Sequence, residues 1–179
     1  MYAKTIARKG TLAGGMLACW AMQLSPVAAD ERLACQNFSW PLQEEIVLMQ
    51  QVAAPIESAA TLPAIPPTAI ELVLKPTASA ELPFKSGIKA KALATQSHSG
   101  WLHFGSLPGA GTYNISISLD GWIDAIQDGT LLESTGFTGS RDCSLLRKSV
   151  RYQAVSQPLT IQVSGVGADK IKLTVRRVE

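Results

Sequence analysis

The sequence predicts an all-β protein, an antiparallel β-sandwich of seven to nine strands preceded by a short helix. Three observations support this prediction. From residue 69 to the C-terminus, apolar and polar residues alternate with the period of two that is typical of strands. Glycine, proline and aspartate separate these alternating segments, as turns do in a sandwich. No segment of helical length interrupts them, which excludes repeated βαβ units.

The N-terminal 29 residues have the features of an export signal. Lys4, Arg8 and Lys9 precede an apolar stretch at residues 12–22, and the small residues 27–29 follow it. A membrane-spanning helix needs about 20 predominantly apolar residues, and glycine, glutamine and proline dilute this run. We therefore expect cleavage after Ala29 rather than a retained anchor, and a periplasmic or secreted protein with no membrane span.

The mature chain has almost no net charge. The signal contains three cations and no acidic residue, so cleavage leaves 13 Lys and Arg against 14 Asp and Glu, a formal charge of −1. Nucleic-acid binding requires a basic surface that neutralises phosphates. We therefore expect no nucleic-acid partner.

Cys35 and Cys143 remain after cleavage. In an oxidising compartment such a pair predicts a disulfide, and two buried free thiols are the alternative. A bridge between them would tie the N-terminal segment to the sheets.

Residues 30–52 are expected to form the N-terminal helical segment. Ser39 is a suitable N-cap, and Pro41 fits the first turn, where a missing N–H is tolerated. Leu42, Ile46 and Met49 then lie on one face. This face would pack on the domain itself or, alternatively, bind a partner.

Residues 53–68 are rich in proline and alanine, with four prolines. Because proline fixes φ and lacks an N–H, neither a helix nor a central strand is expected. We predict an extended connector over the surface, with a strap around a partner as the alternative. Residues 69–179 would then form the sandwich domain.

The sandwich domain contains eight segments with strand character, at residues 69–75, 101–104, 112–119, 122–126, 130–133, 149–155, 159–163 and 171–175. The alternation is clearest at 112–119, where Tyr113, Ile115 and Ile117 share one face. Asp128-Gly129 predicts a tight hairpin, since both residues tolerate a positive φ.

The metal-ligand candidates are few. His98 and His103 lie five residues apart, which places them on opposite faces of a regular strand. Asp120, Asp124 and Asp128 recur every four residues, but turn formation explains such aspartates better than calcium binding does. We expect no metal and no cofactor.

Trp101, Tyr113 and Trp122 would form a platform for a sugar ring if they were exposed, although large aromatic residues in strands are usually core. Trp40 is expected to cover the sandwich near the Cys35 bridge. Asp124 interrupts an apolar strand beside Trp122.

A carboxylate such as Asp124 is expected either to face solvent or to be held by a partner such as Arg147 or Lys148. There is no G-x-S-x-G motif, and the serines beside His98 are only sequence neighbours. No catalytic site is therefore predicted.

One stretch resembles a known module. From Trp101 to Gly129, an apolar strand is followed by Pro108-Gly-Ala-Gly-Thr-Tyr113, an alternating strand and Trp122-Ile-Asp-Ala-Ile. This resembles the jelly-roll domains found C-terminal to secreted bacterial peptidases, and it implies a jelly-roll-like sandwich.

A longer pattern resembles small exported bacterial proteins of unestablished function. It combines Cys35-Gln-Asn-Phe-Ser-Trp40-Pro with Trp122-Ile-Asp124 and Cys143. Some of these relatives are labelled homogentisate 1,2-dioxygenase, an activity that implies a much larger enzyme whose iron is held by two histidines and a glutamate. We reject that label for this chain, whose two histidines are poorly placed for such a site.

Three functions follow from these observations. The first is a non-catalytic accessory or protein-interaction module, such as a small subunit of a periplasmic or envelope complex like a membrane dehydrogenase. The second is a module that binds carbohydrate or cell-wall glycan through Trp101 or Trp122. The third, which we disfavour, is a small metal-dependent enzyme built on His98, His103 and the aspartates.

Overall fold

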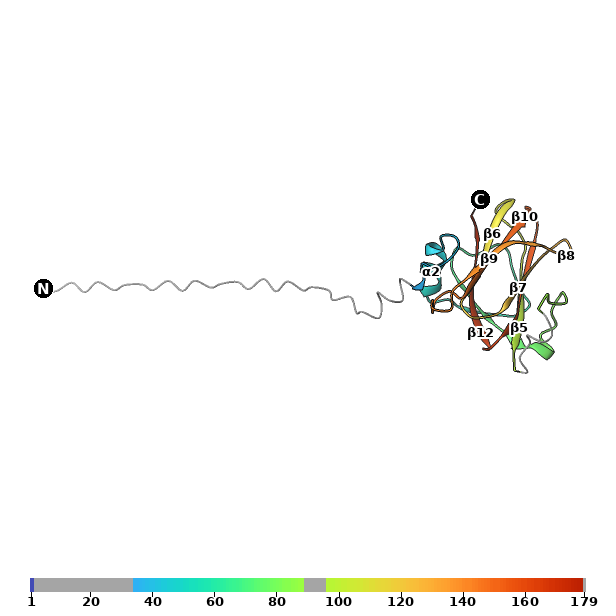
Figure 1. The fold of residues 1–179 in the computed structure, drawn as a ribbon, viewed down its shortest axis with the longest axis horizontal. Coiled ribbons are helices and arrows are strands. Elements are labelled where there is room, and N and C mark those ends of the chain that lie inside the picture. Colours follow the sequence, from blue (N-terminus) through green and yellow to red (C-terminus); the bar gives the residue numbers. More distant parts are fainter. Residues whose placement is uncertain (2–33, 89–95, 179) are drawn as a thin grey trace.

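The described residues form two packed β-sheets (Figure 1). The computed structural model describes Met1, residues 34–88 and residues 96–178, so the expected signal peptide lies outside the described residues except for Met1. The all-β sandwich with one short helix is confirmed. Twelve strands lie within the described ranges, more than the seven to nine expected, because several have only two or three residues and show no alternation.

Each sheet contains a row of long strands with short strands beside it. Sheet A has the order β1 (Pro55–Glu57), β3 (Ile70–Val73), β12 (Lys170–Arg177), β6 (Gly111–Ile117), β10 (Lys148–Ala154) and β9 (Ser134–Gly139). Sheet B has the order β2 (Ala60–Leu62), β5 (His98–Phe104), β11 (Leu159–Val166), β7 (Trp122–Gln127) and β8 (Thr130–Leu131). A further strand, β4 (Lys75–Pro76), pairs with β5, and the 3-10 turn η1 (Thr77–Ser79) follows it.

Residues 53–68, expected to connect two parts of the chain, instead contribute an edge strand to each sheet. β1 pairs in parallel with β3, and β2 pairs in parallel with β5, so both sheets are mixed rather than purely antiparallel. Pro55 is the first residue of an edge strand, a position where its missing N–H disturbs no ladder. Between the strands, the Ser58 N–H donates to Val73 O and the Ala59 N–H donates to Trp101 O. This segment therefore spans from one sheet to the other at one side of the sandwich.

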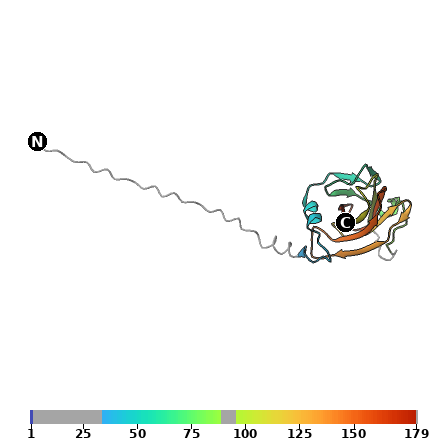
Figure 2. The ribbon, with the colours of Figure 1, turned by 90° about the horizontal axis from the view of Figure 1, so that it is seen from above.

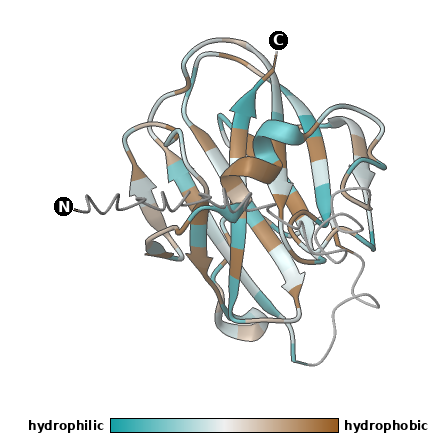
Figure 3. Ribbon diagram, turned by 90° about the vertical axis from the view of Figure 1, so that its left-hand side faces the viewer, coloured by the Kyte–Doolittle hydropathy of each residue, from teal (hydrophilic) through white to brown (hydrophobic). Residues whose placement is uncertain are grey.

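The apolar residues that alternate along β6 lie in the core between the two sheets. Tyr113, Ile115 and Ile117 are completely buried, as predicted. The opposite face of the same strand is also buried, although it is polar: Asn114 is 1% exposed and Ser116 is not exposed. A third layer must therefore cover the outer face of sheet A, and Figure 3 shows a helix lying in front of strands in which hydrophilic and hydrophobic residues alternate.

That layer is the N-terminal segment, with helix α2 (Gln43–Gln50) outside the strands (Figure 2). Leu42 and Met49 are buried, as the helical spacing predicted. The predicted cap is wrong, because the helix begins after Leu42 and the Ser39 N–H instead donates to Thr138 Oγ1 at 2.9 Å. No helix among the described residues is long and apolar enough to cross a bilayer.

The β7–β8 hairpin forms where Asp128-Gly129 predicted it. Both turn residues have positive φ, 47° at Asp128 and 66° at Gly129, which matches the right-handed twist of the flanking strands. After β8 the chain leaves sheet B and crosses to sheet A as β9, a strand that its Ser-Thr-Gly-Phe-Thr-Gly sequence did not predict. Because β8 has only two residues, no strand of residues 34–88 or 96–178 pairs with the first half of β7 at this edge.

Candidate functional site

The predicted disulfide fastens the N-terminal segment to sheet A. Cys35 and Cys143 are bonded, with their Cα atoms 4.7 Å apart and a sequence separation of 108. Together with Leu42 and Leu146 they form a small buried cluster, separate from the core between the sheets. Trp40 packs against this cluster, as expected from the sequence.

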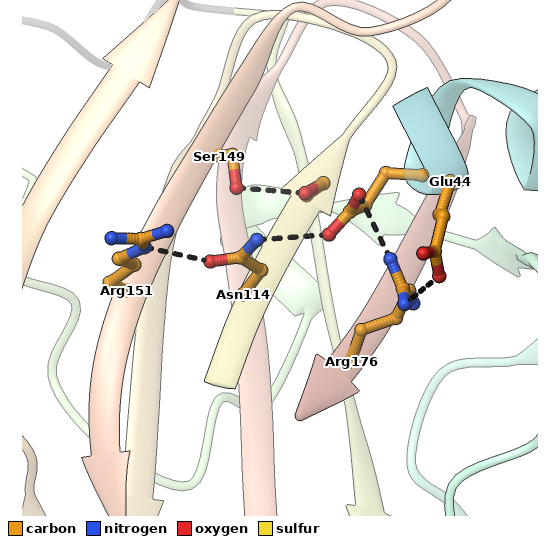
Figure 4. Close-up of polar contacts among 7 residues, drawn as sticks. Glu44, Asn114, Ser149, Arg151 and Arg176 are labelled. Carbon is orange, nitrogen blue, oxygen red and sulfur yellow. Dashed lines mark hydrogen bonds and ion pairs between the residues drawn. The ribbon is translucent and has the colours of Figure 1, made fainter. Parts of the chain in front are cut away.

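A polar network beneath α2 explains the buried polar face of β6 (Figure 4). Glu45 is only 1% exposed, and its carboxylate accepts from Asn114 Nδ2 at 2.9 Å and from Arg176 Nη1 at 3.2 Å. Arg176 also pairs with the exposed Glu44. On the other side, Arg151 Nε donates to Asn114 Oδ1 at 3.1 Å. The buried Asn114 amide is therefore satisfied from both ends.

Trp40 lies over the outer face of sheet A, near its β9 edge. The guanidinium of Arg151 is 4.2 Å from the centre of the Trp40 ring, a cation–π contact. A Cβ placed on Gly136 of β9 would contact the same ring at 3.7 Å. The Arg151 side chain thus links the Trp40 ring to the Glu45 network.

Trp122 and Asp124 come together on sheet B. Trp122 is 41% exposed, and its Nε1 donates to Asp124 Oδ1 at 2.7 Å. The other carboxylate oxygen, Oδ2, accepts from Gln162 Nε2 at 2.9 Å and from the Gly87 N–H at 3.2 Å. The predicted partners Arg147 and Lys148 were wrong; neutral donors from two strands and a loop hold this buried carboxylate instead.

Gln162 also fixes the loop that precedes Gly87. Its side-chain amide donates to Phe84 O at 3.2 Å and accepts from the Phe84 N–H at 3.3 Å. A Cβ on Gly87 would lie 2.9 Å from Trp122 Nε1, so only glycine allows the backbone to approach the indole this closely. The loop and the Trp122 ring are therefore held against each other.

Lys148 lies beside the Trp122 ring. Its Nζ is 5.9 Å from the ring centre and donates to Gly121 O at 2.7 Å. Partial burial lowers the pKa of this ammonium group, an effect that the nearby Asp120 carboxylate opposes. Asp120 itself pairs with Arg147 at 3.6 Å and is largely exposed.

Two pockets meet at Trp122 and Lys148. The larger, of about 350 Å³, is lined by Gly87, Ile88, Asp120, Gly121, Trp122, Lys148 and Gly165. The smaller, of about 160 Å³, is lined by Trp122, Ile123, Ser134, Phe137, Lys148, Val150 and Tyr152. Both pockets are mainly apolar; Asp120 and Lys148 contribute charged groups to the larger one, and Lys148 contributes one to the smaller.

The smaller pocket lies where β7 faces the β9 edge of sheet A. Phe137 pairs with Val150 in the sheet and is 73% exposed. The buried Tyr152 hydroxyl donates to Ile123 O at 2.7 Å, which joins the two sheets across this edge. Burial raises the pKa of Tyr152.

The metal-ligand candidates remain dispersed. His98 and His103 lie on β5, and His103 Nδ1 is hydrogen-bonded to Thr160 Oγ1 at 2.8 Å. Asp120 lies beside Arg147, and Asp128 lies in the hairpin turn. Within residues 34–88 and 96–178, no three His, Cys, Asp or Glu side chains gather closely enough to hold a metal ion.

The three aromatic residues considered as a sugar platform lie apart. Tyr113 is in the core, where its hydroxyl donates to Gly109 O at 2.6 Å. Trp101 is half-buried on β5, with β11 between it and Trp122 on β7. Among these three residues, only Trp122 is exposed, with 41% of its surface accessible.

Comparisons with protein-family models, with curated proteins and with solved structures find no match to this chain. The resemblances noted for residues 101–129 and for the Cys35 and Cys143 segments therefore stay predictions. The properties of the site must be argued from its own residues.

The sequence analysis did not single out Glu45 of the polar network under α2, nor Phe137 of β9. Glu45 falls in the first turn of the helix, where acidic residues are common because they stabilise the helix dipole. The sequence therefore gives no indication that this glutamate is buried. Phe137 stands between glycines and threonines in a segment without alternation. The apolar residue in a turn-like segment was the one available hint.

Proposed function

We propose that this protein is a non-catalytic, exported accessory module that binds a partner protein of the cell envelope. The partner places an extended segment beside β9 and continues sheet A. The observation that carries this proposal is the character of β9, a six-residue strand at the end of its sheet, uncharged, free of proline and centred on the exposed Phe137.

Exposed sheet edges are normally protected, because their unpaired N–H and C=O groups attract other strands. The opposite edge of sheet A is protected in this way, since β1 is short and contains Pro55 and Glu57. The edge strand β8 of sheet B has only two residues. By contrast, β9 has neither a charge nor a proline, which favours use of this edge for binding.

The hydrogen-bonding phase of β9 indicates which groups a partner would meet. The Ser140 N–H donates to Arg147 O at 3.2 Å, so Ser140 bonds toward the β10 side. In an antiparallel strand every second residue bonds to the same neighbouring strand. Gly136 and Thr138 therefore face β10, while the N–H and C=O of Phe137 and Gly139 point away from it, where the described residues place no further strand. An added strand would bond to these groups and place a side chain over Phe137, the mode known as β-augmentation.

Site-specific crosslinking in the exported protein tests this proposal. A photo-crosslinking residue at position 137 should capture a partner protein, whereas one at Val47, an exposed apolar residue of α2, should not. With the photo-crosslinking residue moved to Thr135, another exposed residue of β9, Phe137→Lys should abolish capture and Val47→Lys should preserve it. In the purified complex, hydrogen exchange of the Phe137 and Gly139 amides should be slowed.

Capture that is equal at positions 137 and 47, or capture from position 135 that Phe137→Lys does not reduce, would refute the proposal. Light scattering decides between a partner and a second copy of the chain. A dimer that Phe137→Lys dissociates would assign the β9 edge to self-association and remove the partner from the proposal.

A further inference from the structure

We infer that Trp122 and Lys148 form a binding site for an acidic sugar, a pyranose ring that carries a carboxylate. The sugar ring would stack on the indole, and its carboxylate would bind the lysine ammonium group in the pocket of about 350 Å³. This site goes beyond the proposed partner function and does not depend on it, because ligand binding in this pocket uses neither Phe137 nor the β9 edge, although Trp122 and Lys148 also line the smaller pocket that Phe137 borders.

The Trp122 ring is pre-organised for stacking. Its Nε1 is held by Asp124 Oδ1 at 2.7 Å, and the Gly87 backbone lies against the same edge of the indole. These contacts fix the plane of the ring while 41% of the residue remains exposed. A ring already held in one orientation loses little conformational freedom when a ligand stacks on it.

Lys148 supplies the charge preference. An ammonium group has three donors, and one of them is used by Gly121 O. No carboxylate of the described residues forms an ion pair with Lys148, since Asp120 is paired with Arg147. A ligand carboxylate would therefore give this half-buried cation the anionic partner that the described residues do not supply.

The rest of the pocket favours a sugar over an aromatic acid. Gly87, Ile88, Gly121 and Gly165 line a mainly apolar wall, and Asp120 adds a carboxylate that can accept from hydroxyl groups. A ligand with hydroxyl groups around an apolar ring face matches this combination, whereas an aromatic acid has no hydroxyl donor for Asp120.

Titration of the purified protein with defined ligands tests the site. An oligogalacturonate should quench tryptophan fluorescence and bind at least about tenfold more tightly than a neutral oligoglucose of equal length. Trp122→Ala should abolish binding, and Lys148→Met should lower the affinity for the acidic ligand to that for the neutral one. Lys148→Arg should retain the preference, and Trp101→Phe should leave binding unchanged.

Equal affinity for acidic and neutral oligomers, no binding of either, or tighter binding of benzoate would overturn the inference. Free galacturonic acid, compared with the oligomer, shows whether the site takes a polymer or a single sugar. If Lys148→Met does not fold, as judged by circular dichroism, salt dependence in the unmodified protein replaces it. The preference for the acidic ligand should then fall as the salt concentration rises.

Discussion

Replacing the buried carboxylate under α2 should destabilise the protein more than replacing the exposed one beside it. In Glu45→Ala, Asn114 Nδ2 loses its acceptor in a buried position, which costs about 1–3 kcal/mol. Arg176 loses one carboxylate partner, but it is 26% exposed and keeps Glu44, so this part adds only about 1 kcal/mol, less than for a fully buried pair. We expect a total of about 3 kcal/mol.

Two related substitutions divide this free energy into its parts. Glu45→Gln keeps an oxygen for Asn114 and loses only the ion pair, so it should cost about 1 kcal/mol. Glu44→Gln removes a largely exposed partner of the same arginine and should cost less than about 0.5 kcal/mol. Urea unfolding followed by circular dichroism measures all three, with shifted midpoints and unchanged slopes.

The order of the three substitutions is the decisive result. A loss in Glu44→Gln as large as that in Glu45→Ala would mean that burial of the network contributes nothing. Equal losses for Glu45→Gln and Glu45→Ala would show that the bond to Asn114 is unimportant. Either result would refute the assignment of α2 as a layer held by polar contacts.

Three further predictions concern the Cys35–Cys143 disulfide, the hydrogen bond of Tyr152 between the two sheets, and the β7–β8 hairpin. Replacing Cys35 and Cys143 with serine should lower the free energy of unfolding by about 4–5 kcal/mol, since the bridge closes a loop of 108 residues in the unfolded chain; urea unfolding measures it. Tyr152→Phe should cost about 1 kcal/mol through the lost bond to Ile123 O. Because burial raises the pKa of Tyr152, the stability that its neutral form contributes is complete below the ordinary pKa of 10.0 and is lost above it. The difference in free energy of unfolding between the Tyr152→Phe variant and the wild type should therefore become smaller above this pH. Gly129→Ala should lower stability by about 1 kcal/mol in thermal unfolding, because alanine disfavours a φ of +66°. An added Cβ would meet no neighbour, so the loss reports the backbone conformation alone.

Each of these predictions has an outcome that contradicts it. Unchanged stability in the double serine variant would show that the N-terminal segment is held without the bridge. If the difference in unfolding free energy between Tyr152→Phe and wild type stays constant above pH 10, the hydroxyl group is not effectively buried. A neutral Gly129→Ala substitution would show that the turn relaxes to accept alanine.

Much of the fold was predictable because local sequence and tertiary burial agree there. The alternation of Tyr113, Ile115 and Ile117 predicts a strand with one core face, and the structure buries all three. Asp128-Gly129 predicts a hairpin because few other residue pairs adopt two successive positive φ angles. The disulfide followed from two cysteines in a chain expected to be exported.

The candidate sites were less predictable, because they depend on which faces are covered. Asn114 and Ser116 were expected on a polar face and are buried, since α2 adds a third layer that brings Glu45 to them. Asp124 was correctly seen as anomalous, but its donors, Gln162 and Gly87, are 38 and 37 residues away in sequence. Spacing within a strand carries no information about such donors.

By itself, the sequence determined the class of fold, the hairpin and the cysteine pair, because period, turn chemistry and residue type act locally. Only the tertiary structure decided that residues 53–68 contribute to both sheets, that β9 lies at an open edge and that Trp122 meets Lys148. These features depend on contacts between strands that are distant in the chain, and burial at such contacts is a property of the whole fold.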